Sequence, residues 1–262
     1  MLKKDSLPRV LVGCPINIVK DYCMDQWLEM VKNLTYSNYD VYLVDNTKNP
    51  EYAKGLRKKH NLKIDWVDPA KKEARYYMAD CIEKIRQRAV KKNYDYLMIL
   101  EVDIFPSPDI IQTLMVHDKQ VVGTTYYTGQ GDKTFLQLLW IDQVSKGKYI
   151  TKFFNNRQIR KYFNGTLQKA HANGNGCILI KKQVLHKLKF RVSDQDIGHA
   201  DSFFHQDLFL LGIINWIDTS ILPIHWNSRW SSMPDDADHA LLWDKIKNSP
   251  ERMKSKGIHY NT

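Results

Sequence analysis

Short apolar runs alternate with amphipathic stretches along the first 105 residues. Runs of strand length with buried character predict strands at residues 9–14, 39–45, 63–68 and 97–100. Between them, apolar side chains recur at helical spacing in residues 21–34 and 71–92, and residues 51–60 are expected to form a basic helical segment. This β-α-β-α-β-α-β order predicts a mostly parallel sheet flanked by helices, the type of sheet that binds nucleotides.

The second half of the chain has a less regular pattern. Strands are expected at residues 120–127 and 214–218, a glycine-rich turn leading into a buried strand at 173–180, and helices at 205–212 and 235–256. Residues 131–170 are mixed and basic, and no element is assigned to them. Because no repeat, low-complexity stretch or linker separates the two halves, the sequence predicts a single domain.

The strand at residues 97–100 is followed by two carboxylates, Glu101 and Asp103. Residues i and i+2 of an extended chain point to the same side, and ligands of open α/β sheets bind beyond the carboxyl ends of strands. Two like charges held close together repel each other unless a cation or a proton lies between them. The pattern therefore favours a divalent metal site that receives phosphate oxygens. A pair of solvated acids at a strand end is the alternative.

Composition adds limits on the partner and the compartment. The chain has 39 Lys and Arg against 29 Asp and Glu, a formal charge of +10, which suits a nucleoside diphosphate, a nucleic acid or an acidic surface. The 4 cysteines lack CxxC spacing and are expected to be reduced, buried thiols of a cytoplasmic protein. No apolar leader is visible at the N-terminus, and no run of about 18 apolar residues predicts a transmembrane segment.

The order of several short motifs resembles that of A-type (GT-A) glycosyltransferases, single-domain Rossmann-like enzymes with an acidic "DxD" motif. The resemblance covers roughly residues 9–230, with Glu101 in place of the first acid of the motif. It implies Mn²⁺ or Mg²⁺ as cofactor, bound by Asp103, with Glu101 nearby and a C-terminal histidine, His225, completing the site. Such a metal would stabilise the charge that develops on a leaving diphosphate.

The same resemblance implies a division of the single domain 1–262 and a set of donor-binding residues. The nucleotide-binding half is expected at about 1–105, the acceptor-binding half at about 106–230, and a helical tail at about 231–262. The turn Asn173-Gly-Asn-Gly176 matches the glycine-rich turn under the donor sugar and is neither a Rossmann nor a Walker fingerprint. The residues expected to contact the donor are Pro15, Asp45, Arg75, Val102, Gly174, Gly176 and Arg229.

Gln206-Asp207 matches the position of the family's "ED" pair, with Gln in place of Glu. A carboxylate near a helix N-terminus is stabilised as the anion, and it can take a proton from an acceptor hydroxyl. Asp207 is therefore the candidate general base of an inverting transfer, with His205 as a second candidate. Alternatively, Asp207 only favours the start of the helix.

These observations together predict a metal-dependent glycosyltransferase. Its donor would be a nucleoside diphosphate sugar, with UDP as the expected nucleotide, and its acceptor a hydroxyl of a glycan, a small molecule or a modified nucleic-acid base. A sugar nucleotidyltransferase is the rival enzyme, although residues 13–17 lack the glycine-rich basic loop that holds a triphosphate. The other rival is a basic nucleic-acid-binding module without catalysis, which the charge allows but no known motif supports.

Overall fold

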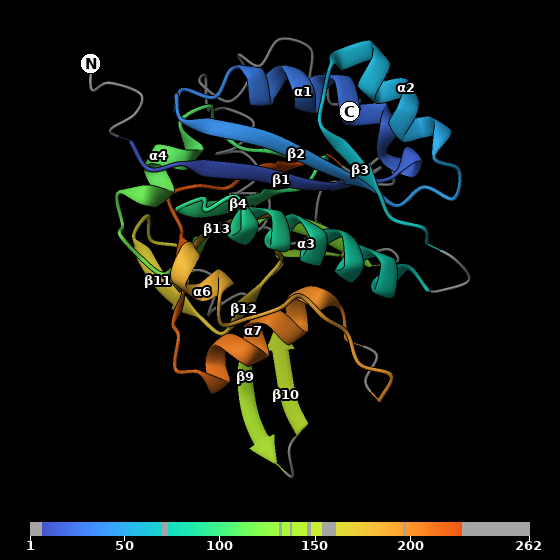
Figure 1. Cartoon of the computed structure of the whole chain (residues 1–262). Helices are drawn as coiled ribbons and strands as arrows, with labels where there is room; N and C mark the ends of the chain where they lie inside the picture. Colours follow the sequence, from blue (N-terminus) through green and yellow to red (C-terminus); the bar gives the residue numbers. More distant parts are fainter. Residues whose placement is uncertain are drawn as a thin grey trace.

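The computed structural model of the 262-residue chain describes residues 7–69, 73–130, 133–136, 138–145, 148–153, 161–195 and 198–226. Within these ranges, a sheet of eight strands forms the centre of the molecule (Figure 1). In spatial order the strands are β11 (Leu167–Ala170), β14 (Asn215–Asp218), β6 (Val121–Gly123), β13 (Cys177–Lys181), β4 (Tyr96–Leu100), β1 (Val10–Ile16), β2 (Tyr39–Asp45) and β3 (Ile64–Trp66).

The strands of the first half pair as the alternating pattern predicts. β4, β1, β2 and β3 are parallel neighbours, and β14 is parallel to β6. β13 runs antiparallel between β4 and β6, and β11 runs antiparallel at the edge beside β14. The fold is thus α/β with a mostly parallel sheet, as expected from the sequence.

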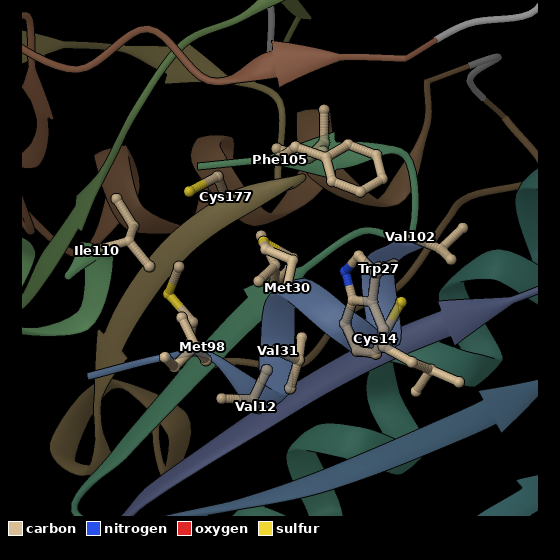
Figure 2. Close-up of a cluster of buried hydrophobic side chains, with 14 of the residues drawn as sticks. Val12, Cys14, Trp27, Met30, Val31, Met98, Val102, Phe105, Ile110 and Cys177 are labelled. Atoms are coloured by element: carbon tan, nitrogen blue, oxygen red, sulfur yellow. The ribbon is translucent and has the colours of Figure 1, made fainter. Parts of the chain in front are cut away.

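Helices cover both faces of this sheet (Figure 1). On one face lie α1 (Met24–Lys32), α2 (Glu51–His60) and α4 (Ile110–Met115); on the other lie α3 (Ala74–Lys91), α6 (Lys182–Leu185) and α7 (Ala200–Leu210). Figure 2 shows Trp27, Met30 and Val31 of α1 packed toward the sheet residues Val12 and Met98. Because the sheet is buried on both faces, its central strands read as continuous apolar runs and not as alternating ones.

Gly13 permits the close approach of α3 to β1. A Cβ atom at this position would lie 2.2 Å from Cγ2 of Ile85, which no relaxed structure tolerates. The missing side chain therefore lets the helix rest directly on the strand. The four cysteines are free and buried, as predicted.

Three small sheets complete the described part of the chain. β5 (Ile104–Phe105) pairs with β15 (Ile224–His225), and β7 (Tyr127–Gln130) with β8 (Lys133–Leu136). β12 (Ala172–Asn173), β9 (Leu138–Ser145) and β10 (Lys148–Phe153) form the third, in which the β9–β10 hairpin projects away from the central sheet (Figure 1). No element was expected here, because the residues are mixed and basic; the β9–β10 pairing also contains a register shift at Ile150/Thr151.

Element boundaries differ from expectation at two places that matter for the site. The helix expected at residues 21–34 begins as a 3₁₀ helix, η2 (Ile18–Cys23), before α1. The helix expected at 205–212 begins earlier, at Ala200. By contrast, β2 and α2 have the predicted bounds residue for residue. The expected helix at 235–256, in the tail 231–262, lies outside the described residues.

Candidate active site at the carboxyl end of β4

Glu101 and Asp103 follow the buried strand β4 and lie in a tight turn. The Glu101 backbone N–H donates to the carbonyl of Gly176 at 2.9 Å, and Ile104 N–H donates to the Glu101 carbonyl at 3.0 Å. Asp103 is almost fully buried at 2% exposure. The turn therefore holds both carboxylates at the sheet edge, as the spacing predicts.

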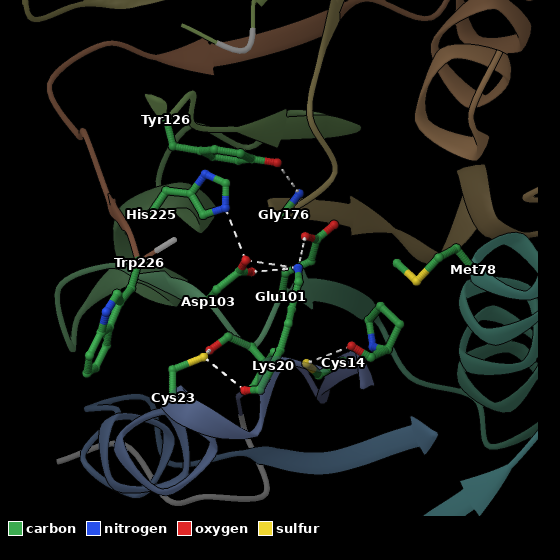
Figure 3. Close-up of polar contacts among 12 residues, drawn as sticks. Cys14, Lys20, Cys23, Met78, Glu101, Asp103, Tyr126, Gly176, His225 and Trp226 are labelled. Carbon is green, nitrogen blue, oxygen red and sulfur yellow. Dashed lines mark hydrogen bonds and ion pairs between the residues drawn. The ribbon is translucent and has the colours of Figure 1, made fainter. Parts of the chain in front are cut away.

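His225 reaches Asp103 from 122 positions away in the chain, with Nε2 3.1 Å from Oδ2 (Figure 3). The pairing of β15 with β5 places His225 opposite Ile104. The backbone N–H of Trp226 donates to the Asp103 carbonyl at 2.7 Å, which further fixes the position of residues 225–226 beside the turn. An ionised carboxylate only accepts hydrogen bonds, so His225 donates from Nε2. The structure thus brings together the three residues proposed as metal ligands.

Lys20 is the residue of this site that the sequence analysis missed. Its Nζ lies 3.0 Å from Oδ1 and 2.9 Å from Oδ2 of Asp103, and 3.6 Å from Oε2 of Glu101 (Figure 3). Its backbone is held by the 3₁₀ helix η2, which Asn17 caps by accepting a hydrogen bond from Val19 N–H. A single lysine carries no motif, and its position three residues past the loop 13–17 was the only sequence signal.

The buried charges perturb one another. Burial alone would raise the pKa of Asp103, but the hydrogen bond from His225 and the charge of Lys20 outweigh it and lower that pKa to about 2. Burial likewise opposes the charge on Lys20, yet Glu101 and Asp103 raise its pKa above the ordinary value. Burial raises the pKa of Glu101. At neutral pH the site therefore contains a firmly ionised Asp103 and a firmly protonated Lys20.

The glycine-rich turn adjoins the segment that carries the carboxylates, because the Glu101 backbone N–H donates to the Gly176 carbonyl. Gly176 N–H donates to the Tyr126 hydroxyl at 3.0 Å, and the Tyr126 ring meets His225 edge to face at 5.2 Å (Figure 3). A Cβ at Gly176 would lie 2.6 Å from that hydroxyl, so only glycine fits. Asn175 is buried, and within the described residues neither of its side-chain polar atoms has a hydrogen-bond partner. An unpaired buried amide beside the carboxylates is a further candidate for ligand contact.

The expected place of Asp207 at a helix start is wrong. α7 begins at Ala200, so Asp207 lies in its second half, where both carboxylate oxygens pair with Arg191 at 2.7 and 3.1 Å. Asp201 occupies the first turn instead. Burial raises the pKa of Asp201, and the charge of Asp201 contributes to the raised pKa of Glu101. Of the two grounds for choosing Asp207, the match to the "ED" pair stays with Asp207, whereas the place near a helix start belongs to Asp201.

His205 is enclosed in the core of the second face. It is 1% exposed, and burial lowers its pKa to about 3, against the opposing effect of the Asn173 backbone. The imidazole is therefore neutral and closed off from an acceptor in this structure. The expectation that His205 serves as a second base receives no support.

Two residues expected to bind the donor, Pro15 and Asp45, lie near the carboxyl ends of β1 and β2. Pro15 does not close β1, which continues to Ile16. β4 pairs with β1 only as far as Gly13, so the missing N–H of Pro15 interrupts no ladder on that side. Asp45 ends β2, and its Oδ1 accepts hydrogen bonds from Thr47 N–H and Oγ1 at 2.9 and 2.6 Å. Its carboxylate therefore fixes the turn after the strand.

The remaining residues expected to bind the donor are less directly placed. Arg75 begins α3, where it pairs with Glu73 and donates to the Ser193 carbonyl at 2.9 Å. These contacts tie α3 to the segment before α7. The Val102 side chain packs in the hydrophobic core, which leaves only its backbone for a ligand. Gly174 is buried within the glycine-rich turn, and Arg229 lies outside the described residues.

The residues at this site do not fit a divalent metal as they are arranged. In the part of the chain that the structure describes, no group of three or more His, Cys, Asp or Glu side chains is arranged to hold a metal ion. The Lys20 ammonium fills the place between Glu101 and Asp103. A divalent cation about 4 Å from an ammonium is repelled by roughly 8 kcal/mol at the effective dielectric constant near a protein surface.

No known family model and no curated protein matches the chain. Among solved structures, the mannosyltransferase PcManGT from Pyrobaculum calidifontis, in complex with GDP-Man and Mn²⁺, aligns with a TM-score of 0.53 at 14% identity. The alignment covers 87% of this chain and 60% of the mannosyltransferase. At this identity the likeness concerns the fold, which is GT-A-like.

Two further solved structures align less well. A197 from STIV matches with a TM-score of 0.47 at 16% identity, over 84% of this chain and 86% of its own. TarS 1–349 from S. aureus matches with a TM-score of 0.47 at 11% identity, over 82% of this chain and 60% of its own.

None of the helices in the described ranges combines the length and the apolar character needed to cross a membrane.

Proposed function

We propose that this protein is a glycosyltransferase that moves a sugar from a nucleoside diphosphate sugar to an acceptor hydroxyl. One observation carries the proposal: Lys20, Glu101, Asp103 and His225 converge at the carboxyl end of β4 in a GT-A-like fold. Ligands of open α/β sheets bind at such an edge. A buried cluster with a fixed ammonium is suited to the phosphates of the donor.

The donor would lie along the carboxyl edge of the sheet. Its base would approach the ends of β1 and β2 near Pro15 and Asp45, and its sugar would lie over the turn that contains Gly174 and Gly176. The expectation that Glu101, Asp103 and His225 hold Mn²⁺ or Mg²⁺ remains a prediction, and the position of Lys20 opposes it. No step is therefore assigned to a metal. The expected UDP nucleotide and the glycan, small-molecule or nucleic-acid acceptor also remain predictions.

The proposed reaction needs a base and a stabilised leaving group. The bond between the sugar's anomeric carbon and the diphosphate oxygen breaks, and its electron pair stays on the diphosphate. The acceptor oxygen bonds to the anomeric carbon, and its proton passes to Asp201, the carboxylate in the first turn of α7. Because burial raises the pKa of Asp201, it is a stronger base than a solvated aspartate.

The geometry disfavours the rival activities. A nucleotidyltransferase holds a triphosphate in a flexible loop after the first strand, whereas Gly13 and Pro15 lie buried within β1 here. The formal charge of +10 still allows a nucleic-acid-binding module. Nucleic-acid binding by a basic surface does not require two carboxylates and an ammonium at one sheet edge.

A ligand panel tests the proposal. The full chain would be heated with nucleoside diphosphates and their sugars, with EDTA or with Mn²⁺, and hydrolysis of each nucleotide sugar would be followed. At least one nucleoside diphosphate should raise the melting temperature, and its sugar should be turned over. Absence of both effects across the panel would reject the proposal, and pyrophosphate release from a nucleoside triphosphate would favour the nucleotidyltransferase.

A further inference from the structure

We infer that Lys20 is the resident cation of this site, and that its ammonium compensates the charge of the donor's diphosphate without a divalent metal ion. The inference rests on the proposed function and names how the same site would bind its donor. The resemblance to metal-using enzymes does not predict a lysine between the two carboxylates. The ammonium lies between Glu101 and Asp103, where a bound metal would otherwise be expected.

Lys20 is held in place by its surroundings. Its backbone N–H donates to the Asn17 carbonyl at 2.9 Å, and its own carbonyl accepts from Cys23 Sγ at 3.2 Å. Cys23 Sγ also contacts the Val102 carbonyl at 3.4 Å, which ties η2 to the turn that carries the carboxylates (Figure 3). A lysine on a fixed backbone loses less conformational freedom when it binds a ligand than a free surface lysine does.

The ammonium retains capacity for a ligand. The Lys20 side chain is 32% exposed, whereas that of Asp103, which anchors the ammonium, is 3% exposed, so Lys20 is not sealed inside the core. An ammonium has three N–H groups. Asp103 engages it at 2.9 and 3.0 Å, but Glu101 at 3.6 Å is too far for a hydrogen bond. A phosphate oxygen that reaches Lys20 therefore finds a hydrogen-bond donor.

This position suits the charge that the reaction produces. When the bond between the anomeric carbon and the diphosphate oxygen breaks, the electron pair remains on the diphosphate. Lys20 keeps its proton and donates a charge-assisted hydrogen bond to that group, while Asp103 keeps the ammonium in place. Lys20 would thereby contribute one charge-assisted hydrogen bond to the leaving diphosphate.

Two measurements on the unmodified chain test the inference. Binding of UDP and GDP would be measured by calorimetry in EDTA and in Mn²⁺, and uptake of Mn²⁺ alone would be followed by the loss of the free-ion resonance signal. We expect the same dissociation constant in both buffers and no Mn²⁺ uptake. A dissociation constant that rises tenfold or more in EDTA and recovers with Mn²⁺ would overturn the inference, as would Mn²⁺ uptake by the unmodified chain.

Three variants identify the residue responsible. Lys20→Met should weaken diphosphate binding in EDTA by about tenfold to a hundredfold, the equivalent of one charge-assisted hydrogen bond, whereas Lys20→Arg should retain most of it. Removal of the ammonium should also let the carboxylates take up Mn²⁺. Lys54→Met, at an exposed lysine of α2 that pairs with Glu51, is the matched control and should change neither readout.

The results separate this inference from the proposed function. Failure of UDP, GDP and their sugars to bind in either buffer rejects the glycosyltransferase proposal and the diphosphate role of Lys20 with it. Binding that depends on Mn²⁺ retains the glycosyltransferase proposal and rejects the role of Lys20. Circular dichroism would show whether Lys20→Met folds. If Lys20→Met does not fold, the same binding test would be made on the double variant Lys20→Met/Glu101→Gln, which keeps the net charge.

Discussion

The Nζ atom of Lys20 lies 2.9 Å from Oδ2 of Asp103, although 83 residues separate the two in the chain. The first belongs to a 3₁₀ helix after β1, and the second to the turn after β4. β1 and β4 are parallel neighbours, so the segments that follow them emerge at the same edge of the sheet. The topology therefore makes this ion pair a feature of the sheet edge where the ligand is proposed to bind.

Replacement of His225 should affect both stability and ligand binding. His225→Asn removes the hydrogen bond to the ionised Asp103 and should lower the free energy of unfolding by about 1.5–3 kcal/mol, the range for bonds to charged groups. Denaturant titration measures this loss, and calorimetry with UDP and GDP should show weaker binding. His117→Asn is the matched control. His117 also contacts an aspartate, with Nε2 2.8 Å from Oδ2 of Asp218, but this pair does not involve Glu101 or Asp103. Equal loss of binding in both variants would contradict the assignment.

Acid stability should depend on Asp103. Its pKa is lowered to about 2 in the folded chain from an ordinary value of 3.8, so its ionised form stabilises the fold at higher pH. This contribution, about 2 kcal/mol by linkage, is complete above the ordinary pKa and is lost as the pH falls from about 4 to about 2.

The comparison with Asp103→Asn isolates this contribution. Glu101 and Asp201 have raised pKa values, so their contributions to stability change in the opposite direction and decline as the pH rises. Free energies of unfolding measured between pH 2 and 5 should fall more steeply toward acid for the unmodified chain than for Asp103→Asn. Parallel curves would show that the carboxylate is not stabilised as inferred.

Replacement of Asp201 and replacement of Asp207 should have different effects on kcat. If Asp201 accepts the proton of the acceptor, Asp201→Asn should lower kcat of sugar transfer by about 10²–10⁴-fold while leaving donor binding intact. Asp207→Asn should break the pair with Arg191 and leave kcat nearly unchanged, because that carboxylate is already engaged. Steady-state kinetics on the two variants decides between them. Loss of kcat in Asp207→Asn alone would restore the assignment made from the sequence.

Two glycines provide a test of the glycine-rich turn. At Gly176 a Cβ would lie 2.6 Å from the Tyr126 hydroxyl, so Gly176→Ala should destabilise the fold by about 1–3 kcal/mol as the neighbours shift. At Gly55, inside α2, a Cβ meets no described atom within 4 Å, so Gly55→Ala should stabilise by about 0.5–1 kcal/mol. Thermal unfolding of both variants measures the difference. A neutral Gly176→Ala would show that the turn is looser than its contacts indicate.

Local patterns in the sequence were enough to predict the framework of the sheet. The apolar runs identify β1, β2 and β4, and the helical spacing identifies α2 and α3, because burial on a strand or a helix leaves a periodic signal in its own residues. The chemistry of Glu101 and Asp103 followed from the same reasoning. Residues 138–153 gave no such signal, because their pattern is mixed and basic, although they pair as a hairpin.

The resemblance had placed His225 beside the two carboxylates, but only the tertiary structure showed how it gets there and added Lys20 to the site. His225 arrives through a pairing of two-residue strands, too short to leave any periodicity, and Lys20 arrives because β1 neighbours β4. α7 begins at Ala200, five residues before the predicted start, which is a larger error than is usual for helix ends, so the place near the helix start belongs to Asp201 and not to Asp207. Hydrophobic periodicity reports what each segment buries, but the charges that meet at a sheet edge depend on how distant segments pair.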